Sequence, residues 1–218
     1  SAQGLTKRKL ILYSNGIEKR KFDLVCKVKK TDGPEFNVLY VGNIGLAQNL
    51  AQLVDVVKDL PATTLTIIGD GLQKSALENK VAKEDIGNVR LTGVKNWQGV
   101  LNDYAATDVL FLSLGRNYPS AVPSKVYEYL SVGCPIVFLG PAGACSSLLE
   151  RFKLVHFIDI GEHDWELSLR RLLVSLRVSD RSVDDEAHAS ENRLLIESAF
   201  IRENAAFRSI SLIQELSG

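Results

Sequence analysis

The stretch "DVLFLSLGRNYPSAVPSKVYEYLSVGCPIVFLG", residues 108–140, contains the unit from which the fold is built. Its apolar opening, Val109–Leu112, predicts a buried strand, and a polar loop and a helical pattern follow. A second apolar run, Ile136–Leu139, begins shortly after Gly133, a residue type that commonly ends helices. Two continuous apolar strands joined through one helix are typical of a parallel sheet that helices cover on both faces.

The same alternation of strand and helix extends over most of the chain. Strands are expected at residues 9–16, 36–42, 64–71, 88–93, 108–114, 135–140 and 154–159. Helices are expected at residues 46–57, 72–77, 97–107, 124–132, 144–152, 165–176 and 191–216, with a loop or a solvated helix start at 179–192. The predicted fold class is therefore α/β: a Rossmann-like parallel sheet with helices on both faces, plus C-terminal helices.

Composition narrows the class of protein. The chain has 218 residues, 45% of them hydrophobic, which suits one large soluble domain or a domain with a tail. Lys+Arg and Asp+Glu both total 26, so no broad surface for nucleic acid is expected. The three Cys are far apart and are expected to be free thiols in a reducing compartment. Trp97 and Trp165 are expected to cover edges of the core.

Ligands of open parallel sheets bind beyond the carboxyl ends of the strands, and four predicted strand ends carry small or polar loops there. These loops are Gly42–Gly45, Gly69–Gly71, Thr92–Val94 and Ser113–Lys125. Together they predict a nucleotide cleft, although each alone is more typical of a tight turn. The spacing in "GNIGLA" differs from GxGxxG, which disfavours an NAD-dependent enzyme, and no phosphate-binding P-loop motif is present.

The start of the helix at 124–132 groups three residues with a possible role in binding. Ser124 is expected to cap the helix, and its first-turn amides could then meet a phosphate. Lys125 in a first turn opposes the helix dipole, a cost that an anionic ligand would offset. Glu128 lies on the same face and could accept hydrogen bonds from a vicinal diol. The plainer interpretation is a Ser cap, a solvated Lys and an exposed or capping-box Glu.

Several motifs in this order resemble one known family. They are "YVGNIGLAQNL", "IIGDG", "VRLTGV", "YAATDVLFLSL", "VPSKVYEYLSVGCPIV" and "FIRENAAFRSISLIQEL". The chain resembles, over nearly its whole length, the C-terminal donor-binding domain of retaining glycosyltransferases of the GT-B fold, the glycosyl transferases group 1 or family 4. It is most similar to bacterial enzymes that move amino or deoxy sugars in O-antigen, capsule or colanic-acid synthesis.

The resemblance implies a nucleotide-diphospho-sugar donor, with a UDP-sugar favoured, retaining transfer of a hexose or N-acetylaminosugar, and neither a metal nor a further cofactor. Glu128 looks like the second Glu of the family's E-x7-E signature, which holds the ribose hydroxyls. Gly93 and Val94 would flank the base. The phosphates and sugar would be approached by Gly42, Asn43, Ile44, Gly45, Gly71, Ser120, Val122, Pro123 and Ser124.

The sequence departs from the family pattern at three positions. Ser120 stands where the first Glu of E-x7-E is usual. Asn43 and Gln48 stand where relatives have the Arg and Lys that neutralise the diphosphate. Lys125, Gln48 and Glu128 are therefore the expected catalytic set, with the leaving diphosphate stabilised by Lys125, Gln48 and helix N-termini. Arg116 is a further candidate cation.

The resemblance also predicts the domain organisation. Residues 1–20 would be an interdomain-crossing segment, 21–178 the nucleotide-sugar-binding domain, and 179–218 helices that pack toward a missing N-terminal acceptor domain. Because that half is absent and the chain has no Met, we expect an excised piece that transfers no sugar alone. The full enzyme would use a lipid-linked sugar acceptor, in the cytoplasm at the inner face of the membrane. The alternatives are a non-catalytic nucleotide-sugar binding module and the catalytic half of a split two-chain enzyme.

Overall fold

A single sheet of parallel strands organises the chain, whose structure is a computed structural model that describes residues 15–31, 33–179 and 183–204. The strands are β1 (Phe36–Val41), β2 (Thr63–Ile68), β3 (Val89–Gly93), β4 (Val109–Ser113), β5 (Ile136–Gly140) and β6 (Val155–Asp159). Their spatial order is β3-β2-β1-β4-β5-β6, so the direction of winding reverses between β1 and β4. The predicted Rossmann-like fold is confirmed, with the switch point at these two strands.

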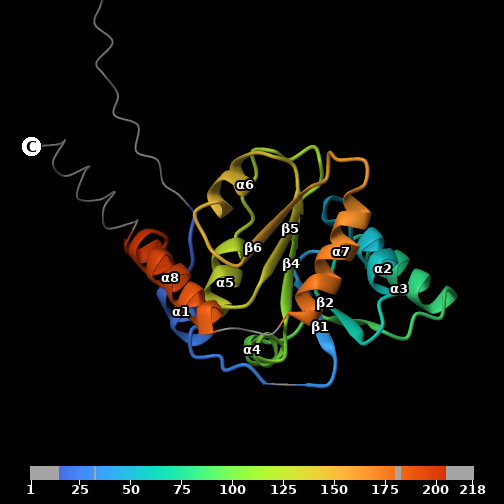
Figure 1. Ribbon diagram of the computed structural model, residues 1–218, viewed down its shortest axis with the longest axis horizontal. Helices are drawn as coiled ribbons and strands as arrows, with labels where there is room; N and C mark the ends of the chain where they lie inside the picture. Colours follow the sequence, from blue (N-terminus) through green and yellow to red (C-terminus); the bar gives the residue numbers. More distant parts are fainter. Residues whose placement is uncertain (1–14, 32, 180–182, 205–218) are drawn as a thin grey trace, which may run out of the picture.

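Helices cover both faces of the sheet (Figure 1). They are α1 (Lys19–Val25), α2 (Leu50–Val57), α3 (Lys74–Lys83), α4 (Trp97–Ala105), α5 (Lys125–Val132), α6 (Ala144–Leu149), α7 (Trp165–Val178) and α8 (Val183–Ala199), with one 3-10 turn at Leu46–Gln48. Buried residues of α1, α4, α5, α6 and α8 form one core layer. Those of α2, α3 and α7 form the layer on the opposite face.

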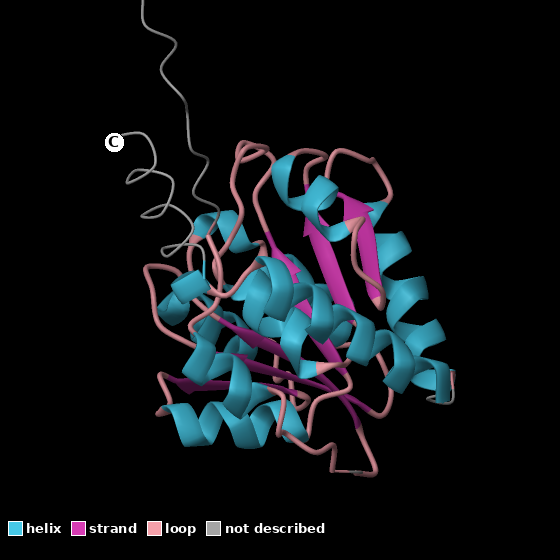
Figure 2. Cartoon of the chain, turned by 90° about the vertical axis from the view of Figure 1, so that its left-hand side faces the viewer, coloured by secondary structure: helices cyan, strands magenta, loops and turns pink. Residues whose placement is uncertain are grey.

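The apolar runs of the strands follow from this double cover. In β4, Leu110 and Leu112 join the core on the α5 side, whereas Val109 and Phe111 join the core on the α2 side. Successive side chains of a strand point to opposite faces, so both the odd and the even positions of such a strand are mostly apolar. Seen from the α8 side, the helices cross in front of a strongly twisted sheet (Figure 2).

Most observed helices differ from their predicted bounds by one to three residues, and three of the differences are informative. The helix expected at 46–57 is divided by Asn49, whose φ of 49° is left-handed, a conformation that Asn tolerates better than most residues. The helix expected from Leu72 begins at Lys74, and the Leu72 side chain is 94% exposed. The helix expected at 191–216 includes the charged 183–190 segment and ends at Ala199. Most of the strand expected at 9–16, and residues 205–218, lie outside the described residues.

The interruption after Ala199 has a physical cause near the start of the described chain. The Ile17 amide donates to the Phe200 carbonyl at 2.9 Å, and the Arg202 amide donates to the Ile17 carbonyl at 3.0 Å, forming a parallel bridge. A Cβ on Gly16 would lie 2.1 Å from the Phe200 oxygen, so this close approach requires glycine. The sequence pattern missed α1, which follows this bridge and packs on α5.

Helix α8 is fixed to the sheet layer by polar contacts as well as by its apolar face. The Arg193 guanidinium donates to the carbonyls of Ser131 and Val132, at 3.0 and 2.8 Å, which satisfies the last turn of α5. The Asn192 side chain is buried and makes two 2.8 Å hydrogen bonds, one to the amide and one to the carbonyl of Lys153. These contacts place α8 within the same folded unit as the sheet.

We predict that Asn192→Ala lowers the free energy of unfolding by about 2 kcal/mol, because the two hydrogen bonds that join the buried Asn192 side chain to the Lys153 backbone are lost. Equilibrium urea unfolding measures this change. Glu191→Ala is the matched control, since this neighbouring side chain is exposed. Equal stability of the two variants would contradict the role given to Asn192.

Candidate functional site

The switch point between β1 and β4 opens a crevice at the carboxyl edge of the sheet. The two strands pair only at Val38–Val109 and Leu39–Leu110, whereas β1 pairs with β2 along all six of its residues. Two residues beyond Leu39, the Val41 amide donates to the Tyr129 hydroxyl at 2.8 Å, and this hydroxyl lies 3.3 Å from the Val41 carbonyl. A tyrosine from α5 therefore takes the backbone groups that a continued β1–β4 ladder would use.

A cavity of about 590 Å³ lies at this edge. Its lining comes from α1, from the carboxyl ends of β1, β2 and β3, and from the first turns of α4 and α5. The lining residues are Lys21, Val41, Gly42, Asn43, Ile68, Gly69, Asp70, Val94, Lys95, Trp97, Val100, Lys125 and Glu128. Five predicted site residues thus come together here: Gly42, Asn43, Val94, Lys125 and Glu128.

Glu128 is the central polar group of the cavity wall. Its side chain is largely buried, and its Oε1 accepts hydrogen bonds from Lys125 Nζ at 2.6 Å and from the Tyr104 hydroxyl. Burial, with the nearby Glu128 charge second, raises the pKa of Tyr104 well above its usual value, so this hydroxyl keeps its proton and donates. Oε2 of Glu128 has no hydrogen-bond partner in the described ranges, so it can accept from a ligand.

Lys125 has a carboxylate partner, which compensates the unfavourable interaction between its charge and the helix dipole. The Glu128 carboxylate one turn later offsets the unfavourable position of the ammonium, without requiring a ligand. The Lys125 side chain keeps 29% of its exposure, so its ammonium can still turn toward the cavity. The expected cap is wrong: Ser124 is exposed, already has helical dihedrals, and makes no side-chain cap hydrogen bond.

The loop after β1 is folded on itself. The Gly45 amide donates to Gln48 Oε1 at 3.0 Å, so this amide is not free for a phosphate. The Tyr40 hydroxyl donates to the Asn43 carbonyl at 2.7 Å and so ties the loop to β1. Ile44 and Gly45 do not line the switch-point cavity; they line a separate hollow of about 230 Å³. Gln48 lies outside both linings and keeps only its amide nitrogen as a possible donor.

The other predicted site residues do not line the cavity. Gly71 and Gly93 lie at its β2 and β3 rim, and Ser120, Val122 and Pro123 lie in the loop between β4 and α5. This loop is anchored by the start of α6, because the Ala144 amide donates to the Pro119 carbonyl at 2.7 Å.

Close backbone approach holds the rim of the cavity together. A Cβ on Gly69 would lie 1.8 Å from the Gly42 oxygen, and the φ of Gly69 is +152°, so only glycine fits there. The loops after β1 and β2 are therefore in direct backbone contact.

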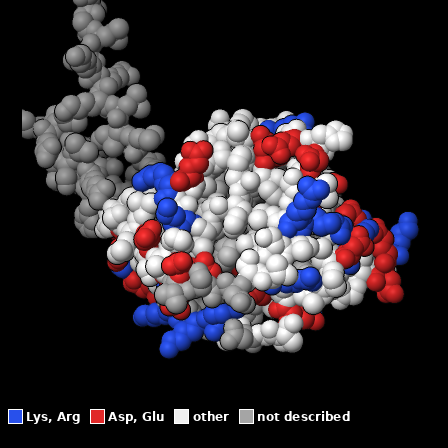
Figure 3. All heavy atoms as spheres, viewed as in Figure 1, with Lys and Arg blue, Asp and Glu red and all other residues white. Residues whose placement is uncertain are grey.

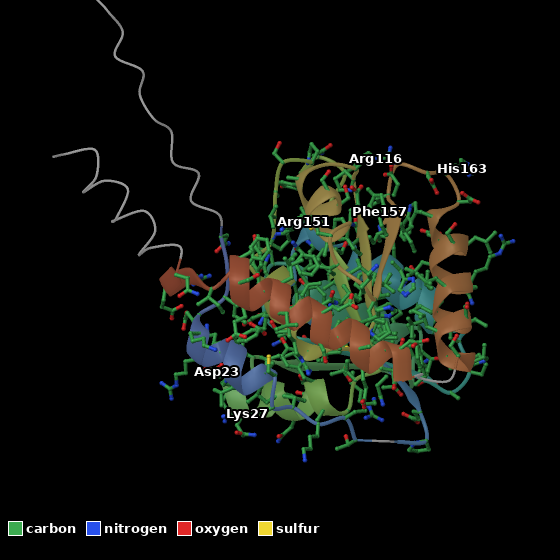
Figure 4. The ribbon with its side chains drawn as sticks, turned by 60° about the vertical axis from the view of Figure 1, so that its left-hand side comes forward. Asp23, Lys27, Arg116, Arg151, Phe157 and His163 are labelled. Atoms are coloured by element: carbon green, nitrogen blue, oxygen red, sulfur yellow. The ribbon has the colours of Figure 1, made fainter. Side chains whose placement is uncertain are left out.

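The extra cation considered from the sequence, Arg116, is engaged elsewhere. Its guanidinium donates to the Ile160 carbonyl at 2.7 Å and so joins the loop after β4 to the end of β6. In Figure 4 Arg116 lies at the upper end of the molecule, at the opposite end from Lys27. It does not line the cavity.

Several residues that line the cavity were not predicted as site residues from the sequence. The indole of Trp97 has ammonium groups at 5.9 Å (Lys21) and 6.0 Å (Lys125) from its ring, and its buried Nε1 has no partner in the described part of the chain. Lys95 also lines the cavity, with its ammonium held by Asp103 at 2.7 and 2.9 Å. Lys21 could not be placed because α1 was not predicted. Trp97 did give a signal, since an aromatic residue lies four positions after a strand end at the ligand edge.

The charge of the surface is mixed. Acidic and basic side chains are interspersed over the face shown in Figure 3. Within residues 15–31, 33–179 and 183–204, no three His, Cys, Asp or Glu side chains gather as a metal site. No helix in these ranges is long and apolar enough to cross a membrane.

Solved structures with similar folds include several glycosyltransferases. HepE from Anabaena, solved with UDP and glucose, has a TM-score of 0.68 at 17% identity, and the match covers 92% of this chain and 55% of HepE. The lipopolysaccharide outer core galactosyltransferase WaaB has a TM-score of 0.62 at 18% identity, with 94% and 57% covered. The C-terminal domain of the LpcC protein from Francisella tularensis has a TM-score of 0.61 at 13% identity, with 85% and 99% covered.

These matches show the fold and its extent. The chain spans about half the length of HepE and WaaB, but nearly all of the isolated LpcC domain. It is a Rossmann-like half of the GT-B fold. A search of curated protein sequences found no match. The model of the family described as glycosyl transferases group 1 matches residues 23–162, and the chain therefore belongs to this family.

Proposed function

We propose that this chain is the donor-binding domain of a glycosyltransferase and that its ligand is a nucleotide-diphospho-sugar, with a UDP-sugar favoured. The observation that carries the proposal is the Lys125–Glu128 pair in the wall of the switch-point cavity. A single side-chain pair there offers a cation and a hydrogen-bond acceptor to one ligand. A nucleoside diphosphate needs both, because its ribose donates hydrogen bonds and its phosphates attract cations.

Each part of the donor has a complementary group. The free oxygen of Glu128 would accept from the ribose hydroxyls, while Lys125 and the first-turn amides of α5 would face the diphosphate. The base would lie near Val94 and Trp97, where an aromatic wall can contact a flat ring. Lys125 would then exchange part of its contact with Glu128 for a contact with phosphate.

Catalysis would consist of stabilising the departing diphosphate by protein groups rather than by a metal ion. Lys125 carries the charge, since Asn43 and Gln48 provide none and Arg116 is held at Ile160. A preorganised donor of this kind typically contributes about 3 kcal/mol to transition-state stabilisation. Retention of the anomeric configuration follows from the family resemblance.

The setting of the reaction is also part of the proposal. The acceptor, a lipid-linked sugar, would bind mainly to another domain, and the full enzyme would act in bacterial surface polysaccharide synthesis at the cytoplasmic side of the membrane. The relatives named above support a second domain because this chain spans only about half of their length. The same half could instead come from a second chain.

Lys125→Ala should weaken the binding of UDP about tenfold or more and leave uridine nearly unaffected, because the lost hydrogen bond is to a charged phosphate. Isothermal titration calorimetry with both ligands measures this difference. Lys95→Ala is the control, since its ammonium lines the same cavity but belongs to the loop after β3, where the base rather than the diphosphate is expected. Equal losses for uridine and UDP would refute the phosphate role.

Glu128→Ala should weaken the binding of uridine about tenfold and leave the binding of 2′,3′-dideoxyuridine unchanged. Only uridine has ribose hydroxyls that can donate hydrogen bonds to the carboxylate. Asp70→Asn tests whether any carboxylate of the cavity has this effect, since Asp70 lines it too. An unchanged preference for uridine over the dideoxy compound in Glu128→Ala would exclude the ribose contact.

The chain alone should bind UDP but transfer no sugar, because the acceptor-binding surface is assigned to another domain. Radiolabelled UDP-sugar, with a membrane extract as the acceptor source, tests this expectation. Transfer by the chain alone would show that it already contains an acceptor site.

The non-catalytic binding module remains the second candidate, favoured by the Gly45–Gln48 contact that closes the β1 loop. Absence of transfer even after addition of an acceptor-binding domain would favour it.

A further inference from the structure

We propose that Tyr104 and Tyr129 are positioning residues that set the two walls of the donor cleft, Tyr129 the β1 wall and Tyr104 the Glu128 wall. The inference rests on the proposed function, because it assigns the diphosphate to the β1 side and the ribose to Glu128. Neither tyrosine lines the cavity, so both would act through the groups that they hold.

Tyr129 acts on the end of β1. Its hydroxyl is bonded to both backbone groups of Val41, and Val41 and Gly42 line the cavity. Without the hydroxyl, the Val41 N–H and C=O would be unpaired in a buried place, or β1 would move toward β4 to pair them. Either change moves the loop that begins at Gly42, on the side where the diphosphate is expected.

Tyr104 acts on the carboxylate. Its side chain is 1% exposed, and its hydroxyl donates to Glu128 Oε1, the same oxygen that binds Lys125. A ligand phosphate that attracts Lys125 would remove the hydrogen bond that Lys125 donates to Glu128. Tyr104 remains bonded in that state, so it keeps Oε1 in place and leaves Oε2 available to the ribose.

The two rings are also coupled to each other. They meet edge to face, with centroids 6.2 Å apart and planes at 87°, inside the core between α4 and α5. Ordinary core packing explains two buried rings but not their hydroxyls, because a phenylalanine would fill the same volume without a polar atom to satisfy. Each hydroxyl instead meets a polar group of the cleft wall.

Tyr104→Phe and Tyr129→Phe should give different binding defects, each about tenfold as expected for one buried hydrogen bond. In Tyr104→Phe, uridine should bind more weakly while 2′,3′-dideoxyuridine is unchanged. In Tyr129→Phe, UDP should lose more affinity than uridine, and the Val41 amide should exchange faster with solvent. Calorimetry and NMR-detected hydrogen exchange on the folded variants measure these effects.

Tyr127→Phe is the matched control, since this buried tyrosine on α5 packs against Phe200 and its hydroxyl has no partner in the part of the chain that the structure describes. It should leave all three ligands and the Val41 amide unchanged. A general loss of stability would weaken the binding of all three ligands by the same factor, and that result would overturn the proposal. If the unmodified chain binds neither UDP nor uridine, the proposed function itself fails. If it binds both and the ligand ratios stay constant in both variants, only the positioning role fails.

Discussion

The early end of the β1–β4 pairing is the constraint on which the rest of the structure depends. Parallel strands that continue side by side leave no room between their ends, and here pairing stops at Leu39–Leu110. An unpaired strand end normally requires water or a ligand for its backbone groups. The Tyr129 hydroxyl meets this requirement from within the protein, because it is bonded to both the amide and the carbonyl of Val41.

The Lys125–Glu128 pair shows how the same site is kept stable and still able to bind. A lysine in a first helical turn and a largely buried carboxylate are each unfavourable alone, and together they compensate each other. A ligand that supplies both a hydrogen-bond donor and an anion can replace both halves of this contact. Specificity for a nucleoside diphosphate would then arise from having two groups at a matching distance, since neither a nucleoside nor a phosphate offers both.

Much of the fold could be predicted because its signals are local. The apolar runs of the strands, and the loops at their carboxyl ends, indicated the sheet and the edge at which five of the expected site residues meet. Contributions from distant segments could not be predicted. Lys21 reaches the cavity through a short helix with weak periodicity, and the Gly45–Gln48 contact depends on a 3-10 turn that resembled the start of α2. Ser124 had a typical capping residue type but not the backbone conformation that a cap needs.

The bridge between Ile17 and Ile201 has a mechanical consequence. The first and last segments of the described chain therefore lie side by side on one side of the unit. Two tethers attached at one point resist twisting and separation less than two attached at opposite sides would. Lys21, four residues after Ile17, lines the cavity, so this point of attachment lies close to the proposed donor site rather than far from it.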